Sequence, residues 1–158
     1  MLKIGPKAFI HLDRIKSNFE KIQKRIGGRV ILSVVKANGY GHGAIEIAKV
    51  ISHFKNSKFA VFSFDEAMQL RNSDISNDII IFSKMRPEFI DQAFTNNIIL
   101  NLSSIEDIKI LKSYKSETNN CPRYHIKFDT GMTRLGINIE DSEHLYKKII
   151  SDLAIHPE

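Results

Sequence analysis

Short apolar runs alternate with helix-forming patterns along almost the whole chain, and this rhythm constrains the fold more than any other feature. Residues 13–25 carry apolar side chains at intervals of three and four and are followed by two glycines, as in an amphipathic helix and its end. The next run, 30–35 (VILSVV), is apolar without alternation, which is typical of a strand covered on both faces. The pair predicts a parallel sheet with helices packed against it.

This unit of strand and helix recurs along the chain. Further strands are predicted at 59–64, 79–82, 98–100 and 124–128. Further helices are predicted at 43–54, at 65–71 with Asp65 in the capping position, from Pro87 to 94, from Ser103 or Ser104 through 111, and at 141–151. No linker or shift in composition interrupts the series, so we expect one domain, residues 1–158, without an internal boundary.

Five β-α units of this kind fit two architectures. They could form an open, doubly wound sheet, or they could be the first five units of an eight-stranded TIM-type barrel. Periodicity alone leaves both open. In either architecture the functional side chains gather in the loops that follow the carboxyl ends of the strands, so those loops are where we look for chemistry.

Composition and charge exclude several classes of protein. The chain is 42% hydrophobic and 26% charged, which is ordinary for a globular domain. A single cysteine, Cys121, excludes an intrachain disulfide framework and a zinc site made of several thiolates. The net charge of +5 is scattered rather than massed, so it is weak support for nucleic-acid binding. No apolar run reaches membrane-spanning length and no signal peptide is recognisable, so we expect a cytoplasmic protein without membrane or nucleic-acid partners.

The loop after the first predicted strand, 34–43 (VVKANGYGHG), places Lys36 where an apolar strand ends. A lysine at the mouth of an apolar barrel or sheet is partly desolvated, which favours a free amine able to form a Schiff base. The alternative is a lysine that extends its charge into water. The glycines permit a tight turn, and Tyr40 offers a hydroxyl. His42, between two glycines, is interpreted as a hydrogen-bond tether rather than a catalytic group.

The loop after the fifth predicted strand, within 124–136 (YHIKFDTGMTRLG), is the second candidate. Period-two alternation places His125, Lys127 and Asp129 on one face of the strand, which could be a barrel interior. A buried lysine needs a partner or a modification that removes its charge, and Arg134 would suit a nearby anionic group. The alternative is a surface ion pair between Lys127 and Asp129, which contributes little stability.

Together the two loops resemble the alanine racemase family, whose members interconvert L- and D-alanine with pyridoxal 5'-phosphate. Segment 34–43 resembles the family's cofactor-lysine signature throughout, and 127–136 (KFDTGMTRLG) resembles its second hallmark. Segments 8–13 (AFIHLD) and 60–67 (AVFSFDEA) extend the similarity over almost the entire chain. The resemblance implies the α/β fold of the family's N-terminal barrel, as the first five β-α units of a TIM-type (β/α)8 barrel.

The resemblance also implies roles for particular residues. Lys36 would form the Schiff base with pyridoxal phosphate and then act as the catalytic base on one face of the substrate. Tyr40 would contact the cofactor phosphate, and Arg134 would reach the phenolic oxygen of the cofactor and the substrate carboxylate. Lys127 corresponds to a lysine that is carbamylated in many members and orients Arg134. No metal is expected.

Family members are much longer than this chain, and their later barrel strands and a separate β domain, which carries the second catalytic base, have no counterpart in it. We therefore expect a truncated chain that is inactive alone. Either it is an isomerase that supplies D-alanine for peptidoglycan only when a second chain completes it, or it is a fragment left by a disrupted gene. The second chain could be a homodimer mate or a complementary chain that supplies the missing strands and β domain. The alternative is a noncatalytic carrier or regulator that binds pyridoxal phosphate.

Overall fold

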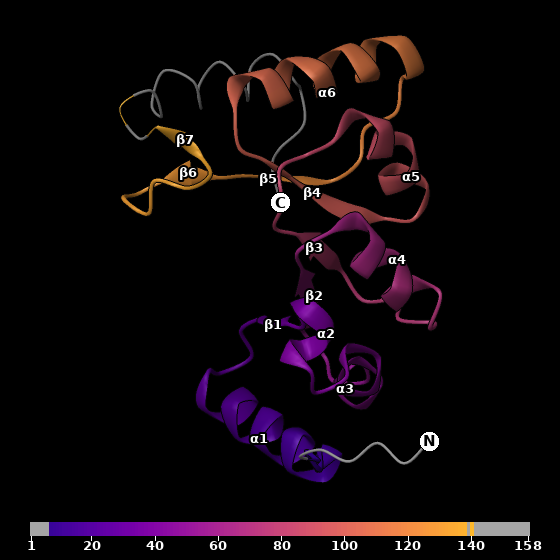
Figure 1. Cartoon of the computed structure of the whole chain (residues 1–158), viewed down its shortest axis with the longest axis vertical. Helices are drawn as coiled ribbons and strands as arrows, with labels where there is room; N and C mark the ends of the chain where they lie inside the picture. The colour runs from indigo at the N-terminus through magenta and orange to yellow at the C-terminus, as the bar shows by residue number, and fades with distance from the viewer. Residues whose placement is uncertain (1–6, 139, 141–158) are drawn as a thin grey trace.

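The computed structural model describes residues 7–138 and 140, and their centre is one parallel sheet. Its strands are β1 (Ile31–Val34), β2 (Ser57–Val61), β3 (Ile79–Ile81), β4 (Ile98–Leu102) and β5 (Tyr124–Ile126). Each strand pairs in parallel with the next one along the chain, in the order β1-β2-β3-β4-β5 (Figure 1). A doubly wound sheet reverses its strand order at a switch point, whereas a barrel adds strands in chain order. The sheet is therefore the first five β-α units of a TIM-type barrel, as predicted.

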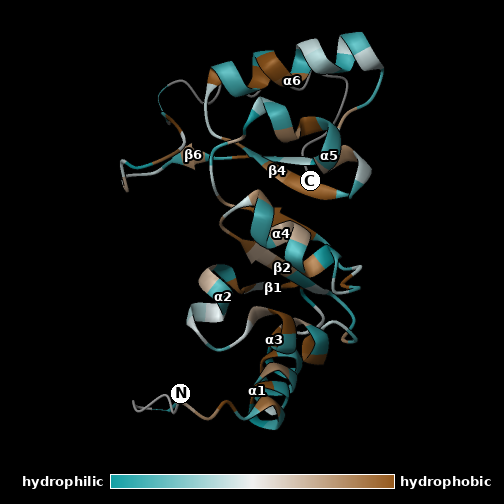
Figure 2. Cartoon of the chain, turned by 45° about the vertical axis from the view of Figure 1, so that its right-hand side comes forward, coloured by the Kyte–Doolittle hydropathy of each residue, from teal (hydrophilic) through white to brown (hydrophobic). Residues whose placement is uncertain are grey.

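One described helix precedes the first strand, and the others lie between consecutive strands. They are α1 (Leu12–Arg25), α2 (Lys36–Tyr40), α3 (Ala44–Ile51), α4 (Phe64–Arg71), the short 3-10 helix η1 (Pro87–Phe89), α5 (Ile90–Thr95) and α6 (Ile105–Thr118). Figure 2 shows both hydrophilic and hydrophobic stretches on α1 and α6, the pattern of helices with one face against a core. Two short strands, β6 (Phe128–Asp129) and β7 (Ile137–Asn138), pair with each other beyond β5.

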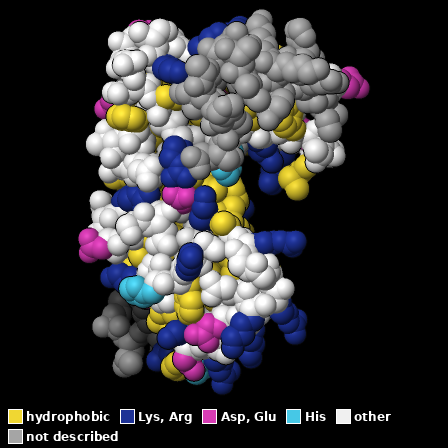
Figure 3. Space-filling model, turned by 180° about the vertical axis from the view of Figure 1, so that it is seen from behind, with side chains coloured by type: hydrophobic (Ala, Val, Ile, Leu, Met, Phe, Trp, Pro, Cys, Tyr) yellow, Lys and Arg dark blue, Asp and Glu magenta, His cyan; other side chains and the backbone are white. Residues whose placement is uncertain are grey.

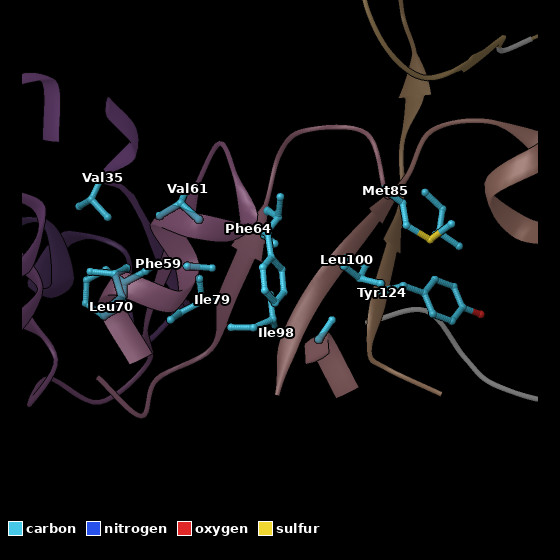
Figure 4. Packing of buried hydrophobic residues seen from close by; sticks show 14 of the residues in the cluster. Val35, Phe59, Val61, Phe64, Leu70, Ile79, Met85, Ile98, Leu100 and Tyr124 are labelled. Carbon is cyan, nitrogen blue, oxygen red and sulfur yellow. The ribbon is translucent and has the colours of Figure 1, made fainter. Parts of the chain in front are cut away.

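The main core lies between the sheet and its helices. Phe59, Ile79 and Ile98 come from three adjacent strands, face the same side, and are completely buried. Leu70 of α4 belongs to the same cluster, and Figure 4 shows it beside Phe59. Burying side chains of this size removes apolar surface from water at about 25 cal/mol per Å², which is the main force holding helices onto the sheet.

The opposite face of the sheet is less completely covered. On β1, Leu32 and Val34 are 37% and 43% exposed, so the prediction that this strand is covered on both faces is wrong. Phe62, which follows β2, is 55% exposed. Val34 pairs with Ala60, and Ala60 with Ile80, so this face continues across the sheet as the inner wall of the barrel. Figure 3 shows hydrophobic side chains at the surface, next to Lys and Arg side chains, when the molecule is seen from behind.

An ion-pair cluster closes the amino end of this inner wall. Asp78, which precedes β3, accepts hydrogen bonds from both terminal nitrogens of Arg123 (2.5 and 3.0 Å) and pairs with Lys58 Nζ (2.7 Å). The bonds from Arg123, and the smaller contribution of Lys58, hold the pKa of the Asp78 carboxyl well below its usual range. We refer to Lys58, Asp78 and Arg123 as the amino-end cluster.

Several predicted boundaries are corrected. The strand predicted at 59–64 runs from Ser57 to Val61, and the fifth strand ends at Ile126 because the chain breaks into β5 and β6 at Lys127. Asp65 does not cap α4. Ser63 does, because its hydroxyl accepts the N–H of Glu66 in a reciprocal capping box.

Three further predictions are not decided by the fold. The helix predicted at 141–151 lies outside the described residues, and the single-domain boundary 1–158 stays a prediction. Within the described part of the chain, no helix is both long and apolar enough to cross a membrane. The cytoplasmic location also stays a prediction.

Candidate active site

Lys36 lies directly beyond the carboxyl end of β1, in a tight turn of unusual conformation. The turn α2 contains left-handed backbone at Ala37 (φ 52°), Asn38 (φ 53°) and Gly39 (φ 61°), and Tyr40 (φ 55°) continues it. A Cβ on Gly39 would lie 3.3 Å from the terminal side-chain carbon of Ile47 on α3, a tight contact that this side chain would have to relieve by a small shift. The positive φ of Gly39 is the stronger reason for glycine here. Lys36 itself is half-buried.

Hydrogen bonds on both sides of Lys36 fix this turn to the sheet. The N–H of Val35 donates to the carbonyl of Ala60 on β2 (2.9 Å), and the N–H of Ala37 donates to Glu66 Oε1 on α4 (2.7 Å). His42 Nδ1 lies 2.9 Å from the carbonyl oxygen of Gly39, in agreement with the tether predicted for it.

The second candidate loop is organised by Asp129. Its carboxylate oxygen Oδ1 accepts the N–H groups of Gly131 (2.9 Å) and Thr133 (3.0 Å), which lowers the pKa of Asp129. Asp129 therefore shapes the loop that carries Arg134. The sequence predicts that His125, Lys127 and Asp129 share one face of a single strand. This prediction is wrong, because His125 lies in β5, Lys127 lies between β5 and β6, and Asp129 belongs to β6.

One cavity of about 850 Å³ brings the two loops together. Lys36 lines it from the first loop, and Lys127 and Arg134 line it from the second, although these loops are far apart in sequence. Phe62 and Phe82 add aromatic walls. We refer to this space as the carboxyl-end cavity, because its lining follows the carboxyl ends of the strands.

Two candidate residues are placed differently from the sequence prediction. Tyr40 is 65% exposed and is not among the described residues that line the cavity; the centre of its ring lies 5.9 Å from Lys36 Nζ. Lys127 is exposed rather than buried, because β5 ends before it and the chain turns away. Arg134 is exposed as well.

The charge of the cavity suits an anionic ligand. Four cationic side chains line it, namely Lys36, Lys84, Lys127 and Arg134, and none of its described lining residues is an aspartate or glutamate. Asp107 lies behind the lining, where it accepts the N–H of Ser103 (2.8 Å) and is 3.9 Å from Lys84 Nζ. Pyridoxal phosphate needs from its site positive charge for its phosphate group, an amine for its aldehyde and apolar or aromatic surface for its ring. The residues that line the cavity offer all three, so they fit this cofactor.

The sequence prediction missed Glu66 as a site residue. Its side chain contacts the main chain next to Lys36 and the main chain of Phe62, which also lines the cavity. The signal was present in the spacing of Ser63 and Glu66, three residues apart at the start of a helix, which is the pattern of a capping box.

Fold and site together define a class of protein: the first part of an α/β barrel, with a lysine beyond the carboxyl end of its first strand and a cationic cavity in front of it. The chain matches the model of the family "Alanine racemase, N-terminal domain" over residues 10–157, and it belongs to that family. An alanine racemase from Lactobacillus gasseri is 37% identical over 137 residues, covering 86% of this chain and 36% of the relative.

Solved structures support the same assignment. Alanine racemase from Clostridium difficile 630 superposes with a TM-score of 0.86 at 27% identity, covering 100% of this chain and 44% of that one. Alanine racemase from Bacillus anthracis with bound L-Ala-P superposes with a TM-score of 0.80 at 28% identity, covering 94% and 40%. The chain thus spans less than half the length of these relatives.

Proposed function

We propose that this chain supplies the cofactor-binding half of an alanine racemase, the isomerase that interconverts L- and D-alanine with pyridoxal phosphate and provides D-alanine for peptidoglycan. The observation that carries the proposal is the position of Lys36. Its amine lies beyond the carboxyl end of the first barrel strand and lines one cavity with Lys127 and Arg134.

The residues divide the chemistry among them. Lys36 would hold the cofactor aldehyde through its amine and, once released, would take or return the proton at the substrate Cα on one face. Arg134 would bind the cofactor's phenolic oxygen and the substrate carboxylate, and Lys127, once carbamylated, would orient it. When bound, pyridoxal phosphate supplies the electron sink for the carbanion that deprotonation leaves. Tyr40 would reach the cofactor phosphate by turning from its exposed position.

Racemisation also needs a base on the opposite face of the substrate, because a proton must leave one face and arrive on the other. The family assigns this role to a tyrosine of the β domain, and the described residues that line the cavity include no tyrosine. We therefore propose that a partner segment supplies the later strands and this base, whether it belongs to a second chain or to the same polypeptide.

The inner wall supports such a partner. Leu32, Val34 and Phe62 leave apolar surface in contact with water, and β1 and β5 each have a sheet neighbour on one side only among the described residues. Exposed apolar surface and unpaired strand edges favour association. The occupant that fits both is a polypeptide with the remaining parallel strands of a barrel.

Reductive labelling tests the role of Lys36. The purified chain is incubated with pyridoxal phosphate, reduced with borohydride, and mapped by peptide mass spectrometry. We expect the pyridoxyl group on Lys36 in preference to other lysines, and loss of that label in Lys36→Arg by about a hundredfold or more, because a guanidinium stays protonated and is not nucleophilic. Equal labelling across surface lysines in both proteins would overturn the assignment.

Complementation tests the reaction. The chain is mixed with the part of the Lactobacillus gasseri enzyme that follows the matched segment, and D-alanine formation from L-alanine is measured. We expect turnover in the mixture and none from the chain alone. Labelling of Lys36 without turnover in a stable mixture would favour the noncatalytic carrier, and turnover by the chain alone would contradict the need for a second base.

A further inference from the structure

The turn that carries Lys36 adopts a conformation that its own sequence disfavours. Ala37, Asn38 and Tyr40 all have positive φ between 52° and 55°, and each carries a Cβ that crowds the backbone in the left-handed region. Asparagine tolerates this region, but alanine and tyrosine do so rarely. Contacts from outside the turn must therefore stabilise it.

Most contacts within the loop hold its later residues. The Gly39 N–H donates to the carbonyl of Val35 (2.8 Å), and Asn38 Oδ1 accepts the N–H of Ala44 at the start of α3 (2.9 Å). The first peptide group after Lys36 is held differently. Its N–H, on Ala37, donates to Glu66 Oε1 at 2.7 Å, from a residue 29 positions away in the chain.

The second carboxylate oxygen of Glu66 is occupied as well. Oε2 accepts the N–H of Phe62 (2.7 Å) and the N–H of Ser63 (3.2 Å). The bond to Ser63 belongs to the capping box of α4, whereas the bond to Ala37 is not needed for capping. One carboxylate therefore joins the loop after β1 to the loop after β2.

The same arrangement recurs two strands further along the sheet. Asp107 occupies the equivalent third position of α6, accepts the N–H of Ser103, and reaches Lys84 in the loop after β3 at 3.9 Å. In both cases the acid at the third position of a helix contacts the loop that follows the neighbouring, earlier strand: Glu66 of α4 contacts the loop after β1, and Asp107 of α6 contacts the loop after β3. The contact made by Glu66 differs because it is made to the peptide group directly attached to the lysine.

We propose that Glu66 is a positioning residue for Lys36: by accepting the Ala37 N–H it stabilises the left-handed turn and fixes the direction from which the Lys36 amine enters the carboxyl-end cavity. Lys36 is then anchored on both sides, through Val35 to β2 and through Ala37 to α4. This inference rests on the proposed function for the claim that Lys36 is the reacting amine, and on the contacts alone for the claim that Glu66 sets the turn.

Substitution of Glu66 by glutamine separates the two functions of the carboxylate, which are capping α4 and holding the Ala37 N–H. Both oxygens of Glu66 accept from N–H groups, but a carboxamide has one oxygen and one NH2 group, which is itself a donor. The amide oxygen accepts two hydrogen bonds when it faces the N–H groups of Phe62 and Ser63, but only one when it faces the Ala37 N–H. The first orientation is therefore favoured, and it places the NH2 group next to the Ala37 N–H, where no hydrogen bond can form. Glu66→Gln should therefore keep the cap of α4 and release the turn.

Ser63→Ala is the matched control. It removes the hydroxyl that accepts the Glu66 N–H (3.2 Å) and so weakens the cap, while both carboxylate oxygens of Glu66 keep their donors. Two measurements compare wild type, E66Q and S63A: the exchange rate of the Ala37 amide proton by NMR without ligand, and the rate at which pyridoxal phosphate and borohydride label Lys36.

We expect E66Q to speed Ala37 amide exchange by about tenfold, as for the loss of one hydrogen bond to a charged acceptor. We expect it to slow Lys36 labelling by about tenfold, because a displaced nucleophile reacts more slowly. S63A should change neither by more than about twofold, although its Tm should fall.

Each result decides the proposal. Unchanged Ala37 exchange in E66Q, or equal changes in E66Q and S63A, would overturn it, and so would faster exchange combined with wild-type labelling of Lys36. If wild type shows no preference for Lys36, the proposed function fails. The ligand-free exchange rates then still decide whether Glu66 sets the turn.

Discussion

The two ends of the inner wall use charge in opposite ways. At the amino end, Asp78 is matched by Lys58 and Arg123 in a cluster of short contacts. At the carboxyl end, Lys36 and Arg134 line a cavity that no described acidic side chain lines. In barrels of this type the amino end serves stability and the carboxyl end serves chemistry. The difference teaches that paired charges stabilise the sheet at its amino end. At the carboxyl end the described cavity lining holds cations but no acidic side chain, so an anionic ligand can supply the negative charge.

Asp78→Asn should disrupt the amino-end cluster, and we expect it to have the largest effect on stability of the substitutions considered. The amide removes the negative charge that faces Lys58 and Arg123, and we expect a loss of about 2 kcal/mol in the free energy of unfolding, in the range for hydrogen bonds to charged groups. Denaturant unfolding measures it. Labelling of Lys36 by pyridoxal phosphate should stay within about twofold, since the cluster lies at the other end of the strands.

Asp74→Asn is the control for this substitution. Asp74 is exposed, lies near Asp78 in sequence, and has a left-handed backbone that asparagine also adopts. It should change the stability by less than about 0.5 kcal/mol. Equal losses for the two substitutions, or a large loss of Lys36 labelling in Asp78→Asn, would contradict the division between the two ends.

Acid should reproduce part of the same effect in the wild-type chain. The pKa of Asp78 is lower in the folded protein than in the unfolded chain, where an aspartate titrates near about 3.9. The stability from this difference is fully present above about pH 5 and is lost as the pH falls through and below about 4. The gap in Tm between wild type and Asp78→Asn should therefore narrow from pH 6 to pH 3. A constant gap would show that Asp78 contributes through packing rather than charge.

Much of the fold could be predicted because its signals are local. Apolar runs without alternation marked β1 and β4, and apolar spacing marked α1, so each of these elements lies close to where the pattern placed it. Strand order was not local information. Periodicity fitted two architectures equally well, and only the resemblance, and then the parallel pairing of every strand with its successor, chose the barrel.

The site shows the same division. Lys36, Lys127 and Arg134 could be predicted as site residues because they lie at or beyond the ends of apolar strands and in the two segments that resemble the family, and the structure brings all three to one cavity. Glu66 was missed because its role depends on a contact with Ala37, 29 residues away, and on a backbone conformation that alanine rarely adopts. Local preferences do not predict a strained turn that tertiary contacts stabilise.

Arg134→Gln tests the role of the cations at the carboxyl end, and we expect the smallest effect from it. Arg134 lines the cavity but is exposed, so its attraction for an anion is weakened by solvent and salt. We expect the Kd for pyridoxal phosphate, measured by calorimetry at low salt, to rise about threefold and the difference to shrink at about 0.5 M salt. The free energy of unfolding should change by less than about 0.5 kcal/mol, because no charge partner is left behind in the cavity lining.

Arg14→Gln tests whether this effect is specific to the cavity. Arg14 lies on α1 and is not among the described residues that line the cavity, and its substitution by glutamine removes one positive charge, as Arg134→Gln does. If the carboxyl end holds its cations for a ligand, Arg14→Gln should leave the Kd for pyridoxal phosphate unchanged. Equal weakening by the two substitutions would mean that the net charge of +5, rather than the cavity, attracts the anion. The two ends of the inner wall would then differ only in their contribution to the free energy of unfolding, because the cations at the carboxyl end would attract an anionic ligand no more strongly than cations elsewhere on the surface.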